Sequence, residues 1–329
     1  MQFRGGFAPS EALAACASLV KAASASQKLP DRLFALDEPD SSGPESLTAV
    51  GKNTRLETRK NLRAGLILAE EGVSELPESV PVLRVTNARQ AIRAIILALA
   101  ERIERPAPFV SGVGNSIHPS AIVEGVLEGD VTVGAGAYVG AGSFVGRGTH
   151  IEPNATIQEH CRIGRHCVIQ SGAVIGCTGF GFLDDLGGAS ETMPHLAGVE
   201  IGDACFIGAN TVVAAGVLHP TEVGNGCKLD SHVQIAHNVR LGKNCLMASQ
   251  SGIAGSTVVG DYFRMGGAAS VAGHLRIGNN VSLAAKSGVT KDIPDGSVVA
   301  GFPAQPIREW RKRQVFLRNS DSYPEKEVS

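Results

Sequence analysis

The stretch VGAGAYVGAGSFVGRGTHI, residues 133–151, carries an aliphatic residue at every sixth position, and the next residue is often glycine. A period of six matches neither the 3.6-residue period of a helix nor the two-residue alternation of a simple strand. It is typical of hexapeptide repeats, in which three short strands and three turns close one triangular coil of a parallel β-helix. This stretch therefore predicts a solenoid in which each coil takes three hexapeptides.

The period extends in both directions from this stretch. It covers residues 127–175, 201–213 and 223–289, and two interruptions, residues 176–200 and 214–222, divide it. Both interruptions are longer than a turn, and we expect them to leave the solenoid as loops, where binding function concentrates. The aliphatic repeat residues should point inward and stack on their counterparts in neighbouring coils, about 4.8 Å apart.

Composition limits the possible functions. The 329-residue chain has a net charge of −2, which gives no electrostatic basis for nucleic-acid binding. It has no apolar run of about 18 residues and no clear secretory signal, so we expect a cytoplasmic protein without a transmembrane segment. Seven cysteines include no CxxC pair. Five of them precede a repeat aliphatic by two residues and are interpreted as small core residues: Cys161, Cys167, Cys205, Cys227 and Cys245.

The regions that flank the repeats have a different character. Residues 1–105 combine the strand-like runs LRAGLILAEE and PVLRVT with the helical pattern NARQAIRAIILALAERIE, which Asn87 caps, and predict a small α/β domain. The Pro- and Ser-rich segment at residues 25–46 predicts a loop. Residues 106–303 then form the β-helix domain, and residues 304–329 are expected to form a short C-terminal helix and a tail.

The solenoid sequence resembles one family specifically. The run KLDSHVQIAHNVRLGKNC (residues 228–245), followed by GIAGSTVVGD, VAGHLRIG and GFPAQPIREW, strongly resembles the UDP-3-O-acylglucosamine N-acyltransferases of lipid A biosynthesis. The resemblance implies a left-handed β-helix that assembles as a homotrimer with active sites between subunits. It also implies transfer of a 3-hydroxyacyl chain from the phosphopantetheine of acyl carrier protein to the amine of a UDP-amino sugar, without another cofactor.

The same resemblance assigns the site residues. His237 matches the general base, His274 a second active-site histidine, and Gly255 the residue whose N–H stabilises the oxyanion. Asp230 matches an aspartate that flanks the base. The chemistry agrees, because an amine that attacks a thioester must lose a proton, and an imidazole with an ordinary pKa of about 6.5 can accept it. Gly255 follows His237 by one coil and His274 follows Asn238 by two, so one strip of the solenoid should hold all three.

Three segments depart from the family pattern. The family holds uracil with Phe-x-x-Asn-x-x-Tyr, where this chain has Thr48, Gly51 and Thr54. The family's Asp-Arg-Gly in the second interruption is Ala-Ala-Gly here (residues 214–216), and its Asp-Gly-Phe-Gly-Tyr is TGFGF (residues 178–182). Because all three changes fall on the sugar-nucleotide side, the acceptor is expected to be held differently or to be another amino sugar of the cell envelope.

Two other functional classes stay open. A non-catalytic trimeric scaffold would explain the lost acceptor motifs. A zinc enzyme of the γ-carbonic-anhydrase type would use His232 and His237, with His195 as a doubtful third ligand, since a zinc site needs three protein ligands. The intact set of His237, Gly255 and His274 favours the acyltransferase, for which no metal is expected.

Two further sets of residues are candidates for substrate or partner contacts. His195 and His219 lie in the two interruptions, from which they can reach the acceptor. The basic residues Arg308, Arg311 and Lys312 lie near the C-terminus, and opposite charge would steer them toward an acidic acyl carrier protein.

Overall fold

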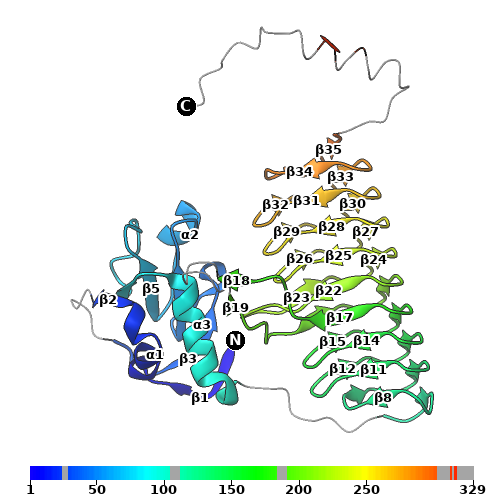
Figure 1. Cartoon of the computed structure of the whole chain (residues 1–329), viewed down its shortest axis with the longest axis horizontal. Coiled ribbons are helices and arrows are strands. Elements are labelled where there is room, and N and C mark those ends of the chain that lie inside the picture. The colour runs from blue at the N-terminus through cyan, green and yellow to red at the C-terminus, as the bar shows by residue number, and fades with distance from the viewer. Residues whose placement is uncertain (24–28, 104–111, 184–190, 302–311, 313–314, 317–329) are drawn as a thin grey trace.

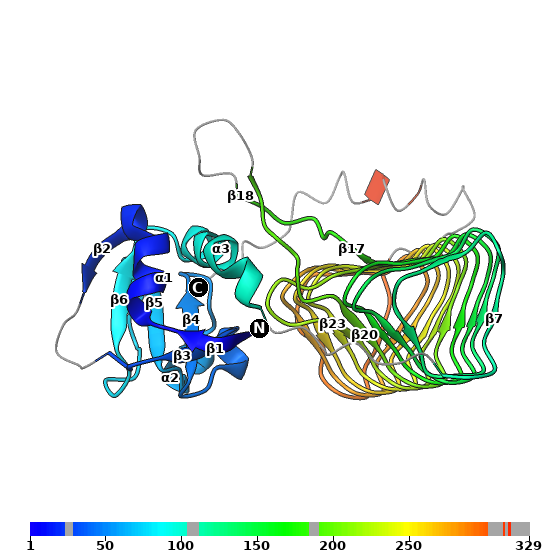
Figure 2. The ribbon, with the colours of Figure 1, turned by 90° about the horizontal axis from the view of Figure 1, so that it is seen from below.

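A computed structural model describes residues 1–23, 29–103, 112–183, 191–301, 312 and 315–316. Its two main parts are an N-terminal α/β domain and a parallel β-helix, which lie side by side (Figures 1 and 2). The expected C-terminal helix, together with Arg308 and Arg311, falls almost entirely outside the described residues and stays a prediction. Among the described residues, no helix is long and apolar enough to cross a membrane.

The N-terminal domain is a six-stranded sheet with three α-helices. Its strand order is β1-β3-β4-β5-β6-β2; the four central strands pair in parallel and the two outer strands pair antiparallel. The strands are β1 (Gln2–Phe7), β2 (Val20–Ala23), β3 (Leu33–Asp37), β4 (Ser46–Val50), β5 (Leu66–Glu70) and β6 (Val82–Val85). The α-helices are α1 (Pro9–Ala15), α2 (Leu56–Lys60) and α3 (Ala88–Leu99), and short 3₁₀ turns are η1 (Ala17–Leu19), η2 (Pro39–Ser41) and η3 (Ala100–Arg102).

The predictions for this domain are confirmed in part. Strands β5 and β6 and helix α3 form where the sequence predicts them, and Asn87 Oδ1 caps α3 by accepting from the Gln90 N–H at 3.0 Å. The loop predicted for residues 25–46 is wrong, because β3 forms inside it. Leu33 and Leu36 are fully buried there, and pairing with β1 and β4 outweighs the turn-forming residues on either side.

The β-helix is built from three parallel sheets, one on each side of a triangular coil (Figure 2). The first sheet contains β7 (Ser116–Ile117), β10 (Thr132–Val133), β13 (His150–Ile151), β16 (Val168–Ile169), β21 (Phe206–Ile207), β24 (Lys228–Leu229), β27 (Leu246–Met247), β30 (Arg264–Met265), β33 (Ser282–Leu283) and β35 (Val298–Val299). The second contains β8 (Ile122–Val123), β11 (Tyr138–Val139), β14 (Thr156–Ile157), β17 (Val174–Cys177), β22 (Val212–Ala214), β25 (Gln234–Ile235), β28 (Gly252–Ile253), β31 (Ser270–Val271) and β34 (Gly288–Val289). The third contains β9 (Val126–Leu127), β12 (Phe144–Val145), β15 (Arg162–Ile163), β20 (Val199–Ile201), β23 (Thr221–Val223), β26 (Arg240–Leu241), β29 (Val258–Val259) and β32 (Arg276–Ile277).

The six-residue period forms the core as predicted. Every aliphatic residue of the period from Leu127 to Val289 belongs to one buried cluster that runs along the solenoid. The five cysteines assigned to the core are buried in the same cluster. Burial of each Val, Leu or Ile side chain contributes about 1.5–3 kcal/mol, so the regular stack accounts for the stability of strands only two residues long.

Both interruptions leave the solenoid and contact the N-terminal domain. The first carries a hairpin of β18 (Phe182–Leu183) and β19 (Glu191–Thr192), and Arg93 of α3 donates from Nε to the Thr192 carbonyl at 3.1 Å. The second carries Leu218, which is buried in the apolar core of the N-terminal domain. The two loops therefore attach the N-terminal domain to the middle of the β-helix, beside the turn that carries His237.

Candidate active site

His237 lies in the turn that follows β25, between the second and third sheets. Its ring is partly buried, and Nδ1 lies 3.2 Å from Oδ1 of Asn238. Asn238 has a φ of 59°, in the left-handed region that asparagine tolerates better than most residues. The turn conformation thus fixes the direction in which His237 leaves the backbone.

Gly255 and His274 lie on the same strip, as the spacing predicts. The Ser256 N–H donates to the His237 carbonyl, and the His274 N–H donates to the Gly255 carbonyl, both at 3.0 Å. A Cβ at position 255 would lie 2.7 Å from Cε1 and Nε2 of His237. The His237 ring therefore packs directly against the backbone of Gly255, and only glycine fits there without moving the ring.

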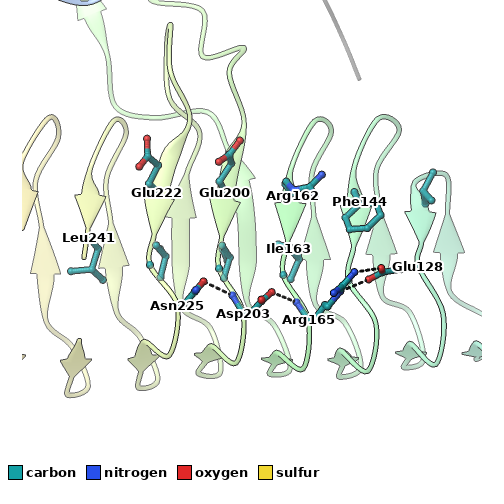
Figure 3. A pocket seen from close by; sticks show the side chains of 17 residues that line it. Glu128, Phe144, Arg162, Ile163, Arg165, Glu200, Asp203, Glu222, Asn225 and Leu241 are labelled. Carbon is teal, nitrogen blue, oxygen red and sulfur yellow. Dashed lines mark hydrogen bonds and ion pairs between the residues drawn. The ribbon is translucent and has the colours of Figure 1, made fainter. Parts of the chain in front are cut away.

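The N–H of Gly255 is free to bind a ligand. At some other turns of the solenoid, side chains from the next coil accept from the equivalent N–H group: Asp203 from Arg165 at 2.7 Å, and Asn225 from Asp203 at 2.8 Å (Figure 3). Within the described part of the chain, nothing accepts from the Gly255 N–H. An uncapped donor beside a histidine is the arrangement that an oxyanion site requires.

The capped turns of Figure 3 border a different surface feature. They line a hollow of about 620 Å³ on the outer face of the third sheet, where Arg165 also pairs with Glu128. His237 is not among its lining residues. The polar groups at its turns bind one another, and no histidine is among the described residues that line it, so the chemistry points to the His237 turn instead.

His274 contacts the N-terminal domain. Arg55 donates through one terminal nitrogen to the His274 carbonyl at 3.1 Å, and the same nitrogen pairs with Asp292 at 3.1 Å. Partial desolvation, followed by the electrostatic influence of Arg89, His237 and Arg55, lowers the pKa of His274. His274 is therefore neutral near pH 7 and can either donate or accept a hydrogen bond.

A third histidine, His195, completes the group. It comes from the first interruption, and its ring centroid lies 5.1 Å from that of His237 in an edge-to-face arrangement. Its Nδ1 lies 2.7 Å from the Met193 carbonyl, and burial, with a smaller contribution from His237, lowers its pKa to about 4. Among the described residues its buried Nε2 has no hydrogen-bond partner. His195 thus presents an unprotonated nitrogen, a hydrogen-bond acceptor, close to His237.

The TGFGF segment (residues 178–182), which packs against the His195 ring, brings two aromatic residues to the site. Cβ atoms at Gly179 and Gly181 would both lie within 3 Å of the His195 ring, so the two glycines allow the loop to cross it closely. Phe180, between them, is 87% exposed, and its ring packs edge-to-face against Phe182 at 4.9 Å. This exposed pair is an aromatic surface next to the histidines.

Asp230 lies at another turn of the same chain. It follows β24, between the first and second sheets, and strand β25 separates it from His237. Its carboxylate accepts from the Ser231 N–H at 2.7 Å and from the Ser249 N–H at 3.1 Å. Within one chain, the structure brings His237, Gly255 and His274 together but does not bring Asp230 to them.

The positions matched to the uracil motif do not form a binding platform. Thr48 is fully buried in β4, and Gly51 and Thr54 lie in the turn that follows. Arg55, the next residue, instead anchors the domain to the solenoid. In the second interruption Ala214 and Ala215 are buried, so the Ala-Ala-Gly sequence provides packing and presents no charged group.

The predicted zinc alternative finds no support in one chain. His232 is exposed at the turn before β25 and His237 lies at the turn after it, so their side chains start from opposite ends of that strand. Across the described ranges, no group of three or more His, Cys, Asp or Glu side chains could hold a metal ion.

Comparisons with known proteins agree with the sequence resemblance. The family model for the bacterial transferase hexapeptide (six repeats) matches residues 142–177 and 220–255, and that for the hexapeptide repeat of succinyl-transferase matches residues 198–233. A UDP-3-O-acylglucosamine N-acyltransferase of Pseudomonas syringae is 48% identical over 155 residues, which is 47% of this chain and 44% of that protein. UDP-3-O-acylglucosamine N-acyltransferase 2 of Legionella pneumophila is 54% identical over 153 residues, 46% of this chain and 44% of that protein. The match thus spans less than half the length of these relatives.

A solved structure supports the fold independently. The UDP-N-acetylglucosamine O-acyltransferase of Moraxella catarrhalis superposes with a TM-score of 0.50 at 26% identity, covering 60% of this chain and 77% of that one. The predicted β-helix of hexapeptide repeats and the resemblance to UDP-3-O-acylglucosamine N-acyltransferases are therefore both confirmed.

Proposed function

We propose, from the homology of its β-helix to UDP-3-O-acylglucosamine N-acyltransferases, that this protein is an N-acyltransferase of lipid A biosynthesis. It would move a 3-hydroxyacyl chain from acyl carrier protein to the amine of a nucleotide-linked amino sugar. The observation that carries the proposal is the packing of the His237 ring against Gly255, whose N–H is uncapped, with His274 on the next coil. A base and an oxyanion donor are what aminolysis of a thioester requires.

The proposed reaction follows from this geometry. The amine nitrogen of the acceptor attacks the thioester carbon while His237 Nε2 accepts one amine proton. The negative charge that develops on the thioester oxygen is stabilised by the Gly255 N–H. Collapse of the tetrahedral intermediate breaks the carbon–sulfur bond, and the imidazolium of His237 returns its proton to the departing thiolate. The products are an amide and the free phosphopantetheine thiol, so atoms and charges balance.

The acceptor is the part of the proposal that departs from the relatives. Thr48 is buried and the turn after β4 holds no aromatic residue, so a base cannot stack there as in the family pattern. The exposed pair of Phe180 and Phe182 next to His195 offers another aromatic surface. We therefore place the sugar-nucleotide end of the acceptor against the first interruption, and we keep a different envelope amino sugar as the second candidate.

A trimer would complete the site. Asp230 lies at a different turn from His237, so in this proposal it flanks the histidine from a neighbouring subunit. Size-exclusion chromatography with light scattering would give three times the 34.1 kDa chain mass. A monomeric and active protein would contradict the role given to Asp230.

The test of the function is a transfer assay with 3-hydroxyacyl-loaded acyl carrier protein and a panel of amino sugars. Product with UDP-3-O-acylglucosamine supports the function of the relatives, and product only with another amino sugar supports the second candidate. A folded trimer that acylates none of them would favour the non-catalytic scaffold and overturn the proposal. Calorimetric titration with UDP separates the first two cases, because tight UDP binding requires a nucleotide site.

A further inference from the structure

A chain of side-chain contacts runs from His237 into the N-terminal domain. His237 Nδ1 lies 3.2 Å from Asn238 Oδ1, and Asn238 Nδ2 donates to Oε1 of Glu38 at 2.9 Å. Glu38 follows β3 and is 200 residues away in sequence. A carboxylate of one domain thus reaches the histidine of the other through a single amide.

The surroundings of Asn238 fix the orientation of that amide. Its Oδ1 also accepts from the Val217 N–H at 3.2 Å, and its Nδ2 also donates to the His219 carbonyl at 3.3 Å. Exchanging the oxygen and nitrogen would set a donor against a donor at Val217 and acceptors against acceptors at Glu38 and His219. The oxygen must therefore face His237.

This orientation determines the tautomer of His237. Because Asn238 Oδ1 only accepts, His237 Nδ1 must carry the proton in that contact. The other nitrogen, Nε2, is then unprotonated, and it is the nitrogen that packs against Gly255. The tautomer that the network selects is the one a general base at this site needs.

Glu38 is itself held by charges from both domains. Its Oε2 lies 4.0 Å from a terminal nitrogen of Arg240, whose Nε lies 3.8 Å from Glu222. Burial raises the pKa of Glu38, the Arg240 charge opposes this, and Asp40, the N-terminal ammonium and Asp37 act from its own domain. The His219 ring is neutral, because burial lowers its pKa to about 4.

We propose that Glu38 is a positioning residue, which acts through Asn238 to hold His237 in the Nδ1–H tautomer and to stabilise its imidazolium during transfer. The N-terminal domain then helps to position the catalytic histidine. The stabilisation of the imidazolium during transfer rests on the proposed function, whereas the selection of the Nδ1–H tautomer does not.

The test compares Glu38→Ala and Glu38→Gln with a matched control, Glu222→Gln, which touches Arg240 but not Asn238. Nitrogen NMR of labelled His237 reports the tautomer, and the pH profile of kcat/KM reports imidazolium stability. Glu38→Ala removes the shortest of the three contacts that orient the Asn238 amide. It should therefore mix the tautomers and lower kcat by about tenfold or more, as expected when an orienting group is lost. Glu38→Gln retains an accepting oxygen, so the tautomer should persist while the acid limb of the profile moves to lower pH.

The outcomes separate this inference from the function. The control should match wild type in both measurements. A Glu38→Ala protein that is folded, keeps the pure Nδ1–H tautomer and keeps the wild-type pH profile would overturn the inference. If Glu38→Ala fails to fold, an unchanged pH profile in Glu38→Gln overturns the stabilising role. If wild type transfers no acyl chain, the proposed function fails, and the tautomer measurement still decides whether Glu38 positions His237.

Discussion

Replacing Gly255 with alanine should disable the enzyme and leave the β-helix folded. The new Cβ would lie 2.7 Å from Cε1 and Nε2 of His237, whereas ordinary van der Waals contact is 3.4–4 Å. The ring must therefore shift by at least about 0.7 Å, the difference between 3.4 and 2.7 Å. Gly255 is not among the residues with positive φ, so alanine adopts its backbone conformation without strain.

Two effects determine how far kcat falls in Gly255→Ala. A displacement of about 1 Å in a catalytic group lowers the rate about 100-fold. Interference with one oxyanion donor lowers kcat about 100- to 1000-fold. We expect kcat to fall at least about 100-fold, which corresponds to about 2.7 kcal/mol of lost transition-state stabilisation. The melting temperature should change by no more than a few degrees.

The assay follows acyl transfer from acyl carrier protein by mass spectrometry, with Gly252→Ala as the control. Gly252 lies three residues earlier in the same coil, and a Cβ there meets only Cβ of Gln234 at 3.6 Å and the Gln234 carbonyl oxygen at 3.7 Å. The control should keep wild-type kcat. A folded Gly255→Ala protein with kcat within about threefold of wild type would refute the assigned geometry.

Four further results are expected. Burial lowers the pKa of His219 to about 4, whereas the unfolded chain binds a proton at this residue below about pH 6.5, so the free energy of unfolding should decline as pH falls from 6.5 to 4. His219→Gln should flatten the dependence of the melting temperature on pH. An unchanged slope would contradict the role of His219. Phe180→Ala should raise the KM of the acceptor without changing the KM of acyl carrier protein. An acceptor KM equal to that of wild type would show that Phe180 does not contact the acceptor. Leu218→Ala should lower the melting temperature by several degrees, because it opens a cavity of the kind that costs about 2–5 kcal/mol in the N-terminal core; an unchanged melting curve would argue against this docking. Burial raises the pKa of Cys161 to about 12, so iodoacetamide at pH 8 should label it only after denaturation, and rapid native labelling would show that the core is open.

The fold was predictable where sequence periodicity is strong. The six-residue spacing from Leu229 to Ile235 and from Ile235 to Leu241 predicts that these side chains point into the solenoid. All three are buried. The strand β3 gave no such signal, because it is five residues long and its burial depends on pairing with β1 and β4. The sequence also does not predict that Leu218 packs in the N-terminal core, since this contact depends on how the second interruption lies against that domain.

Some residues of the candidate site were predictable from the sequence, and others were not. Spacing of one coil placed Gly255 over His237, because every coil of the solenoid has the same length there. The family resemblance gave Asp230 a role beside His237, but one chain places it at another turn. No sequence pattern pointed to Glu38, because it lies in another domain and is 200 residues away from its partner Asn238.

The most direct test of the account is the rate of acyl transfer by His237→Ala beside wild type, with 3-hydroxyacyl-loaded acyl carrier protein and the acceptor that wild type uses. A general base contributes about 100- to 10,000-fold, so the account predicts a loss of that size in a protein that remains folded. A folded His237→Ala protein that transfers at the wild-type rate would contradict the assignment of His237 as the base.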